Sequence, residues 1–545
     1  MPRNILLIIV DDLRPQINTY GASEMVTPHL DALASRGVIF ENAFVQQSIC
    51  SPTRNSFLSG RYPDKTKTWN FVDDFRAEGP DWVALPQFFK EHGYWTGGAG
   101  KVYHPTHPPN FDQKLSWVGT WRDYGKCECG GTGWPPGGGA SCEGIKPTPT
   151  TCGDDTIVDI VKGQLQMAAN GTLGSSPTQP WLIAAGLHKP HLPFYARAED
   201  FALYPNPSPP KPLNVSTDMP YVAWHSCLSN ARGGLGSNWG NFTDIPNAMT
   251  FETPMAAASA ARLRRGYSAS VTYTDHNVGL IIGAMTPQQK ETTIVLFMGD
   301  HGWSLGEQNV WCKMTNSENG VRVPLMIYAP ETQQANGMKI AALAEAVDIY
   351  RTLADLSGLG DALVEAGVDG VSLAPLVNSV DPNAMPSKDL PRLIARSQFP
   401  RCYSQLTNAS ASSPEKLPIL DRTDCQDILR EDFDLMGYSI RTPAWRITEW
   451  RDWDGVALAG KWDGVANATE LYYHGSAGSS SSSSGNGNGA VDPFASELAN
   501  VVSNPAHAAI LATLRAQLKN TFTTPQPKNN RRSYASQYVN IAVHG

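Results

Sequence analysis

The sequence predicts an α/β protein: a large, mostly parallel central sheet flanked by helices, followed by a smaller C-terminal α+β subdomain with an antiparallel sheet. Continuous apolar runs, typical of strands buried on both faces, alternate with helix-like stretches in the first part of the chain. Past about residue 378 the composition shifts to Pro, Asn and Ser, and the apolar residues that follow alternate as in antiparallel strands. Hydrophobic residues make up 41% of the 545, enough for a sizeable core.

The first predicted strand is the apolar run of residues 5–10, which leads directly into two aspartates. Helical apolar spacing and closing glycines such as Gly37, Gly93 and Gly358 predict helices between the strands. In chain order the further elements are a helix over 28–35, a helix over 82–92, a strand over 181–187, a helix over 262–284, strands over 293–298 and 323–328, and a helix over 347–356.

Two domains are expected, a catalytic α/β domain over residues 1–380 and a C-terminal subdomain over 381–545. Residues 437–450 and 465–473 alternate like antiparallel strands. The serine and Gly-Asn run over 475–489 has the low complexity of a flexible loop, and the chain is polar from about Thr523 onward.

Charge and hydropathy exclude several classes of function. A net charge of −8 and a pI near 5.9 argue against a nucleic-acid partner, which calls for a basic face. No apolar run approaches the ~18–20 residues that span a bilayer. The run over 5–10 meets Asp11-Asp12 without a small-residue cleavage site, so we interpret it as a strand and expect any targeting peptide to lie outside this sequence.

Of the nine cysteines, eight remain when Cys50, a candidate reactive residue, is set aside, and eight is an even number. Four of them cluster in a loop over 111–152 that is rich in Gly, Trp and Cys, but they lack the C-x-x-C pairs of zinc sites. A disulfide such as Cys142–Cys152 is therefore the preferred interpretation, with Cys402–Cys425 as a second pair. The clustered residues are Cys127, Cys129, Cys142 and Cys152.

Five Asn-x-Ser/Thr sequons fit passage through the secretory pathway, hence a lysosomal or extracellular location. A cytoplasmic or periplasmic location stays open, because such tripeptides also occur by chance. The sequons are at Asn170, Asn214, Asn241, Asn408 and Asn467.

Acidic residues follow two of the predicted strands at their carboxyl ends. Asp11-Asp12 come after the first strand and Asp300-His301 after the strand over 293–298. Ligands of such sheets bind at this rim, so the side chains are expected to meet there. Adjacent buried acids repel each other without a cation, and Ca²⁺ tolerates irregular oxygen ligands better than Mg²⁺, which stays possible. The alternatives are a helix cap for the first pair and a turn with a satisfied histidine for the second.

Cys50 lies in the pentapeptide Cys-Ser-Pro-Thr-Arg, which Arg54 closes. If Cys50 caps a helix, Arg54 lies on the same face, and the helix N-terminus favours an anion there. The alternative for Arg54 is a surface ion pair. Further candidates follow predicted strands or short glycine-rich loops, although each taken singly is more typical of a solvated lysine or a structural histidine: Lys101, His104, His188 and Lys313.

These segments together resemble the sulfatases of the alkaline-phosphatase superfamily, and among them most of all the iduronate-2-sulfatases. The C-x-P-x-R motif at Cys50 is the family's signature, in which the cysteine is oxidised to formylglycine. Six blocks stand in the family's order between about residues 4 and 475: 6–15 (LLIIVDDLRP), 42–60, 100–105 (GKVYHP), 188–194 (HKPHLPF), 300–307 (DHGWSLGE) and 436–442 (MGYSIRT). The resemblance implies the alkaline-phosphatase-like sulfatase fold.

The resemblance also implies the roles of the candidates. Asp11, Asp12, Asp300 and His301 would hold a calcium ion together with the formylglycine at Cys50. Arg54 would steady the formylglycine hydrate, and Lys101 and Lys313 would clamp sulfate oxygens. His104 is the implied base that collapses the sulfated hemiacetal, and His188 the implied acid or donor to the leaving oxygen. Thr53 and Ser59 depart from the commoner residues of the extended motif, but the C-x-P-x-R core is intact, so maturation by a formylglycine-generating enzyme is expected.

The implied substrate is a sulfated carbohydrate, and the likeness to iduronate-2-sulfatases points to the 2-O-sulfate of a uronic acid in a glycan. Lys189, Arg441 and Arg446 are candidates for the cation that would bind the sugar carboxylate. The alternatives are a sulfatase for another polysaccharide or a small sulfate ester, a phosphomonoester or phosphonate hydrolase of the same superfamily, and an inactive binding homologue.

Overall fold

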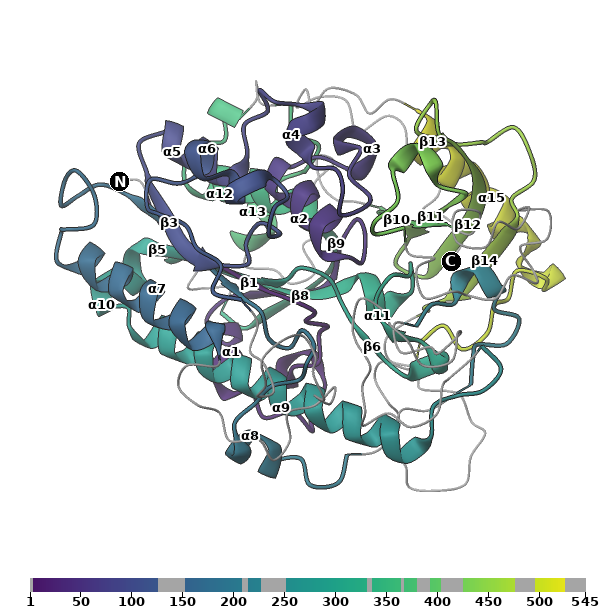
Figure 1. Ribbon diagram of the computed structural model, residues 1–545, viewed down its shortest axis with the longest axis horizontal. Coiled ribbons are helices and arrows are strands. Elements are labelled where there is room, and N and C mark those ends of the chain that lie inside the picture. The colour runs from purple at the N-terminus through teal and green to yellow at the C-terminus, as the bar shows by residue number, and fades with distance from the viewer. Residues whose placement is uncertain are drawn as a thin grey trace.

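Two large sheets organise the chain, and β6 (Ser304–Leu305) and β7 (Trp311–Cys312) form a third, two-stranded sheet (Figure 1). The computed structural model describes residues 3–125, 152–207, 214–226, 251–330, 336–363, 367–379, 393–402, 425–475 and 496–524. Within these residues, a seven-stranded sheet with helices on both faces precedes a five-stranded sheet along the chain. The predicted α/β class with a smaller antiparallel unit is confirmed.

The central sheet has the strand order β3-β4-β1-β5-β8-β2-β9. Strands β3, β4, β1 and β5 pair in parallel, as do β2 and β9, whereas β8 runs antiparallel to both of its neighbours. The sheet is therefore mostly parallel, as predicted, but mixed. The strands are β1 Asn4–Val10, β2 Val38–Phe44, β3 Trp95–Gly100, β4 Trp181–Leu187, β5 Thr293–Gly299, β8 Arg322–Tyr328 and β9 Met338–Glu345.

Helices bury both faces of this sheet, which explains why β1 is apolar from Ile5 to Val10 without alternation. Along β1, Leu6, Ile8 and Val10 belong to one hydrophobic cluster, and Ile5, Leu7 and Ile9 belong to the other. The first cluster includes α1 Pro28–Ala34, α7 Gly153–Ala169 and α9 Ala257–Gly283, which lie below the sheet in Figure 1. The second includes α2 Cys50–Ser59, α5 Leu85–Glu91, α12 Ile349–Leu356 and α13 Ala374–Val377, which lie above it.

The predicted helices exist, but their ends differ. The helix predicted over 28–35 ends at Ala34 and is capped by Ser35, not by Gly37. The helix predicted over 82–92 begins only at Leu85, where Pro86 suits the first turn. The shorter elements are α3 Pro63–Thr66, α4 Phe75–Glu78, α6 Gln113–Ser116, α8 Ala198–Ala202, α10 Pro287–Thr292, α11 Glu318–Val321, β6 Ser304–Leu305 and β7 Trp311–Cys312.

The second sheet is antiparallel, as the alternating pattern predicted. It consists of β10 Ala395–Arg401, β11 Leu435–Arg441, β12 Trp445–Asp454, β13 Ala459–Gly460 and β14 Ala468–Tyr473, and α15 Ala508–Thr523 packs against it. The expected boundary between residues 380 and 381 lies outside the described residues, so the two-domain division stays a prediction. The low-complexity stretch past residue 475 and the tail past Thr524 also lie outside them.

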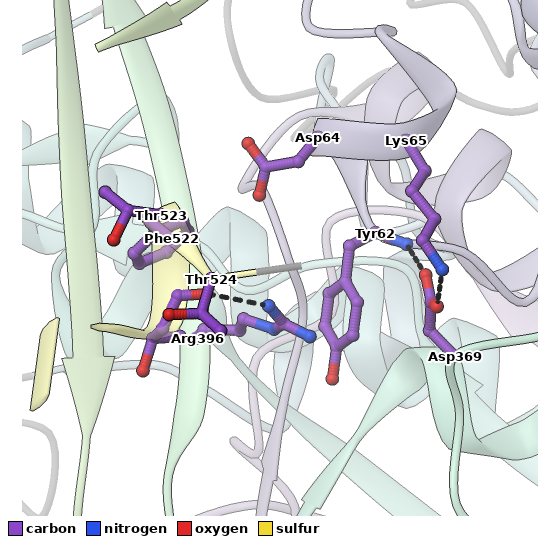
Figure 2. A pocket seen from close by; sticks show the side chains of 9 residues that line it. Tyr62, Asp64, Lys65, Asp369, Arg396, Phe522, Thr523 and Thr524 are labelled. Carbon is purple, nitrogen blue, oxygen red and sulfur yellow. Dashed lines mark hydrogen bonds and ion pairs between the residues drawn. The ribbon is translucent and has the colours of Figure 1, made fainter. Parts of the chain in front are cut away.

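The segment that follows α2 and the C-terminal sheet with α15 meet around a cavity of about 240 Å³ (Figure 2). The guanidinium of Arg396, on β10, lies over the ring of Tyr62 at 3.1 Å from its centroid. Lys65 pairs with Asp369 at the other side of the cavity, and Arg396 donates to the carbonyl of Thr521 in α15. The C-terminal sheet is thus fastened to the segment that follows α2.

Cys402 and Cys425 form a disulfide, which confirms that predicted pair. Cys152 is disulfide-bonded too, but Cys142 lies outside the described residues together with Cys127 and Cys129. Among the described cysteines only Cys50 is free. In the part of the chain that the structure describes, no helix has the length and apolar character needed to cross a membrane.

Gly98 in β3 offers a test of this packing. Its φ is +142°, and an added Cβ would meet the carbonyl oxygen of Ala184 on β4. Gly98→Ala should therefore lower the free energy of unfolding by about 3 kcal/mol or more. Gly283→Ala is the matched control, because Gly283 ends α9 with open space around its Cβ position, and alanine there should be neutral or slightly stabilising. Equal denaturation midpoints for the two variants would contradict the packing described.

Candidate active site

The carboxylates of Asp11, Asp12 and Asp300 meet at the carboxyl edge of the central sheet. Asp11 and Asp12 follow β1, and Asp300 follows β5, which is the strand beside it. Strand pairing continues past the strand ends, because Asp11 N donates to Leu187 O and Asp300 N donates to Val10 O. All three aspartates are fully buried. The sequence prediction that these residues come together is borne out by their geometry.

Asp300 fixes the backbone around it. Its Oδ1 accepts from the backbone N–H of Asp12 at 3.0 Å and of His301 at 2.9 Å. Its Oδ2 accepts from Arg54 Nε at 3.0 Å and lies 2.8 Å from a terminal nitrogen of that guanidinium. Both oxygens are thereby engaged, and the peptide that joins Asp300 to His301 is held against β1.

Cys50 begins α2, with Ile49 as the N-cap, so its side chain points into the carboxylate cluster from a helix N-terminus. Its Sγ lies 3.3 Å from Asp11 Oδ1, 3.3 Å from His301 Nε2 and 3.1 Å from Lys313 Nζ. Arg54 follows one turn later on the same face, as predicted, and is fully buried instead of forming a surface ion pair.

Three buried cations face the three carboxylates. Lys101 Nζ lies 2.5 Å from Asp11 Oδ2, and Lys313 Nζ lies 2.5 Å from Asp12 Oδ1. Arg54 bridges Asp300 and, at 3.5 Å, Asp11. The formal charges of the six side chains cancel, which is what allows them to be buried together.

The pKa values in the cluster follow from burial and from these neighbours. Burial alone would raise the pKa of Asp11, but Lys101 and the other nearby cations hold it well below its usual value. Burial raises the pKa of Asp12 to about 7, with Lys313 opposing and Asp11 adding to the shift. Burial and Asp11 also raise the pKa of the Cys50 thiol, so the unmodified cysteine is a poor thiolate nucleophile.

Four of the five predicted metal ligands form one compact group. Ligand atoms of Asp11, Asp12, Cys50 and His301 all lie within 4.8 Å of one another. The buried Asp12 Oδ2 has no hydrogen-bond partner among the described residues, and hard divalent cations prefer such carboxylate oxygens. The donor set therefore fits a cation, with Asp300 beside the group and already bound to Arg54.

The two candidate histidines lie in opposite environments. Burial, Lys101 and Arg54 lower the pKa of His104 well below its usual value, and its buried Nδ1 has no hydrogen-bond partner among the described residues. His104 stacks on Phe71 at 4.6 Å between ring centroids. His188 is fully buried, and its pKa is raised although burial opposes this, because two carboxylates flank it.

Those two carboxylates, Asp123 and Asp154, were missed by the sequence analysis. Asp123 Oδ1 lies 2.9 Å from His188 Nε2, and Asp154 Oδ1 lies 3.1 Å from His188 Nδ1. Asp154 stands in the first turn of α7, where an acid is ordinarily explained by the helix dipole, so its position gave no distinguishing signal. His191 was also missed, and its Nε2 lies 4.0 Å from Asp12 Oδ2.

Comparison with known proteins places this chain in a family. The family model "Sulfatase" matches residues 3–359. Iduronate 2-sulfatase of Mus musculus is 30% identical, over 94% of this chain and 93% of that protein, and the Homo sapiens enzyme is 30% identical over 86% and 88%. The chain belongs to the sulfatase family. Choline-sulfatase of Rhizobium meliloti is 28% identical over 69% of this chain and 72% of that protein.

Solved structures share the fold of this sulfatase at lower identity. A 2-O GAG sulfatase superposes with a TM-score of 0.63 and 19% identity, covering 96% of this chain and 92% of that one. A phosphonate monoester hydrolase from Silicibacter pomeroyi has a TM-score of 0.61 and 19% identity, covering 95% of each chain. These likenesses support the fold, in agreement with the expected alkaline-phosphatase-like architecture.

The three cations considered for a sugar carboxylate are engaged within the sulfatase itself. Lys189 Nζ donates to the carbonyls of His191 at 2.6 Å and Pro193 at 2.8 Å. Arg441 and Arg446 both bind Glu318, at 3.0 and 2.5 Å. These contacts give each of the three cations a structural role.

Arg54→Gln tests how far the cluster depends on its buried cations. The change leaves Asp300 and Asp11 buried with one cation fewer, so the free energy of unfolding should fall by about 3–5 kcal/mol. Lys65→Gln is the matched control, since its ion pair with Asp369 is partly exposed and should be worth at most about 1 kcal/mol. Chemical denaturation of both variants measures the difference. A loss below that of the control would show that Arg54 does not balance the carboxylates.

Proposed function

We propose that this sulfatase uses a formylglycine made from Cys50 and a divalent cation, Ca²⁺ or alternatively Mg²⁺, to remove 2-O-sulfate from a uronic acid residue of a glycan. The observation that carries the proposal is the buried Cys50 Sγ at the start of α2, within 3.3 Å of Asp11, His301 and Lys313. A side chain that attacks at sulfur requires such a position, beside cations that stabilise the developing negative charge.

The proposed ligands of the cation are Asp11, Asp12, Asp300, His301 and the modified residue 50. When bound, the cation and the formylglycine hydrate would supply an ionised oxygen nucleophile and neutralise charge around it. Arg54 would steady the formylglycine hydrate, and its contacts hold the carboxylates of Asp300 and Asp11 in place. Lys313 Nζ lies 3.1 Å from Cys50 Sγ, and Lys101 binds Asp11, which contacts the same sulfur, so the two ammonium groups are proposed to bind the sulfate oxygens.

Two histidines complete the proposed machinery. His104 is held neutral by burial and by Lys101, which suits a general base that takes a proton from residue 50. His188 is the proposed proton donor to the leaving oxygen, and its flanking carboxylates favour the protonated form. The two opposite protonation states match the two opposite tasks.

The proposed substrate rests on the relatives. The 30% identity to two iduronate 2-sulfatases covers most of both chains, and a 2-O GAG sulfatase shares the fold. Another structural neighbour was solved in complex with its substrate D-glucosamine-2-N,6-O-disulfate, with a TM-score of 0.64 and 16% identity. A panel of defined disaccharides tests the proposal, because desulfation should be fastest for a terminal 2-O-sulfated uronic acid. Faster release of 6-O- or N-sulfate would assign a different sugar.

The phosphonate monoester hydrolases among the structural neighbours define the alternative activity. Sulfate and phosphate esters have similar shapes, and both would meet the same three cations. Matched sulfate and phosphate monoesters of one phenol distinguish the two, and we expect a higher kcat/KM for the sulfate.

We further propose maturation in the secretory pathway by a formylglycine-generating enzyme. The Cys402–Cys425 disulfide supports an oxidising compartment. The sequon residues Asn170, Asn214 and Asn467 are all exposed, as glycosylation requires. Peptide mass spectrometry of the purified protein would report both modifications.

Cys50→Ser tests the nucleophile. A serine hydroxyl in this position can attack sulfur, but it lacks the second hydroxyl that would expel sulfate afterwards. The variant should therefore stop after one turnover and carry one sulfo group on residue 50, which mass spectrometry detects. Cys50→Ala is the control and should gain no mass. Wild-type turnover by the serine variant would exclude the proposed elimination.

Calcium binding tests the cation site. Asp12→Asn should abolish high-affinity Ca²⁺ binding, measured by isothermal titration calorimetry, and should remove the rise in melting temperature that Ca²⁺ gives. Glu497→Gln is the control. Glu497 belongs to a second group of possible ligand residues, with Glu318 and His474, but Arg446 already pairs with both of its acids. Loss of binding in Glu497→Gln alone would move the cation to that second group.

A further inference from the structure

The charge state of His188 follows from its hydrogen-bond geometry. Its Nδ1 lies 3.1 Å from Asp154 Oδ1 and its Nε2 lies 2.9 Å from Asp123 Oδ1. An ionised carboxylate can only accept, whereas a neutral imidazole has one N–H and would turn a lone pair toward one of the two oxygens. Both contacts are satisfied together only by the doubly protonated ring.

Asp154 accepts hydrogen bonds through both of its carboxylate oxygens. Its Oδ1 accepts from the backbone N–H of His188 at 2.9 Å, and its Oδ2 accepts from that of Lys189 at 2.9 Å. It is fully buried in the first turn of α7, where the helix dipole favours negative charge. One carboxylate therefore fixes both the backbone and the ring of His188.

Asp123 is placed differently. It follows β3 on a loop, its side chain is 9% exposed, and its Oδ1 also accepts from Gly125 N at 3.2 Å. Burial would raise its pKa, but His188 and, more weakly, Lys101 hold it below its usual value. Backbone hydrogen bonds place both residues beside the cluster: Gly100 N donates to Arg122 O at 2.9 Å, next to Asp123, and Asp11 N donates to Leu187 O at 3.0 Å, next to His188.

We propose that Asp154 and Asp123 are positioning residues that keep His188 doubly protonated and aim its Nε2–H at the ester. Asp154 holds Nδ1 throughout, and Asp123 holds the Nε2 proton until the bridging oxygen of the substrate takes its place. As sulfur forms its new bond to the oxygen of residue 50, the bond between sulfur and the bridging oxygen breaks, and the electron pair of the broken bond stays on the bridging oxygen. That oxygen receives the Nε2 proton and leaves as an alcohol, and His188 regains a proton from water. This inference rests on the proposed function.

The other charged groups near His188 do not supply this effect. Lys101 binds Asp11, and as a cation it would disfavour a further positive charge nearby. Asp155, the next residue of α7, is bound by Tyr273 of α9, whose hydroxyl donates to its Oδ1 at 2.6 Å. Asp155 is thus a matched control: the same residue type in the same helix turn, without a contact to the imidazole.

The experiment measures the titration of His188 directly, on the full-length protein labelled with ¹⁵N-histidine. The chain has twelve histidines, and the signal that disappears in His188→Gln assigns the residue. In the wild type both ring nitrogens should be protonated at neutral pH. Asp154→Asn and Asp123→Asn should each move the titration to lower pH by about one unit or more, since each removes an opposite charge in contact. Asp155→Asn should leave it unchanged.

The kinetic readout is the pH profile of kcat/KM on the best sulfated disaccharide. Its alkaline limb should move to lower pH in the two asparagine variants, together with the NMR titration. A shift of one unit lowers kcat/KM about tenfold at every pH above the wild-type limb. A purely structural defect would lower the whole profile without moving it. If the variant at the more deeply buried position, Asp154→Asn, fails to fold, the Asp123→Asn variant still tests the proposal.

The outcomes separate the two proposals. An active enzyme in which His188 titrates at the wild-type pH in both variants overturns this inference alone. A wild-type His188 that is neutral at pH 7 also overturns it. A shifted titration in a protein that cleaves no sulfate ester, although residue 50 is formylglycine, instead contradicts the proposed function.

Discussion

The whole site depends on burying three carboxylates against three cations at one edge of a sheet. Asp11, Asp12 and Asp300 occupy this edge because two neighbouring strands end there, and each aspartate continues the strand hydrogen bonding by one residue or follows one that does. Unpaired, such charges would cost several kcal/mol each. Arg54, Lys101 and Lys313 balance them, so the two lysines proposed to bind sulfate also help to keep the carboxylates buried.

The antiparallel sheet contacts the segment that follows Lys313, one of the three cations of this cluster. Glu318 lies five positions after Lys313 and is bound by Arg441 of β11 and Arg446 of β12. Asn316 donates to the carbonyl of Gly437 on β11 as well. The segment that carries Lys313 is therefore clamped by the antiparallel sheet. Arginines that the sequence offered as substrate ligands are used for this clamp.

The spacing of apolar residues predicted those strands and helices whose formation depends on nearby residues. The buried run of β1 and the acids that end it were recognisable, because a strand covered on both faces must be apolar at every position. Strand β3 was missed, since Trp95–Gly100 is glycine-rich, and Gly98 is required by close approach to β4 rather than by propensity. The reversed direction of β8 was not predictable either, because pairing between distant strands leaves no local signal. Asp123 and Asp154 were missed for the same reason, because the histidine that they contact is distant in sequence.

The two histidines show how much of the chemistry lies in the surroundings of a side chain. His104 and His188 are both largely buried, and burial alone would leave both neutral. Lys101 and Arg54 reinforce that effect at His104, whereas Asp123 and Asp154 reverse it at His188. The proposed base and the proposed acid can then have the same side chain and act at one pH within one site. In the proposed mechanism the motif residues supply the reacting atoms, and the carboxylates of Asp123 and Asp154 decide which of the two histidines carries the proton.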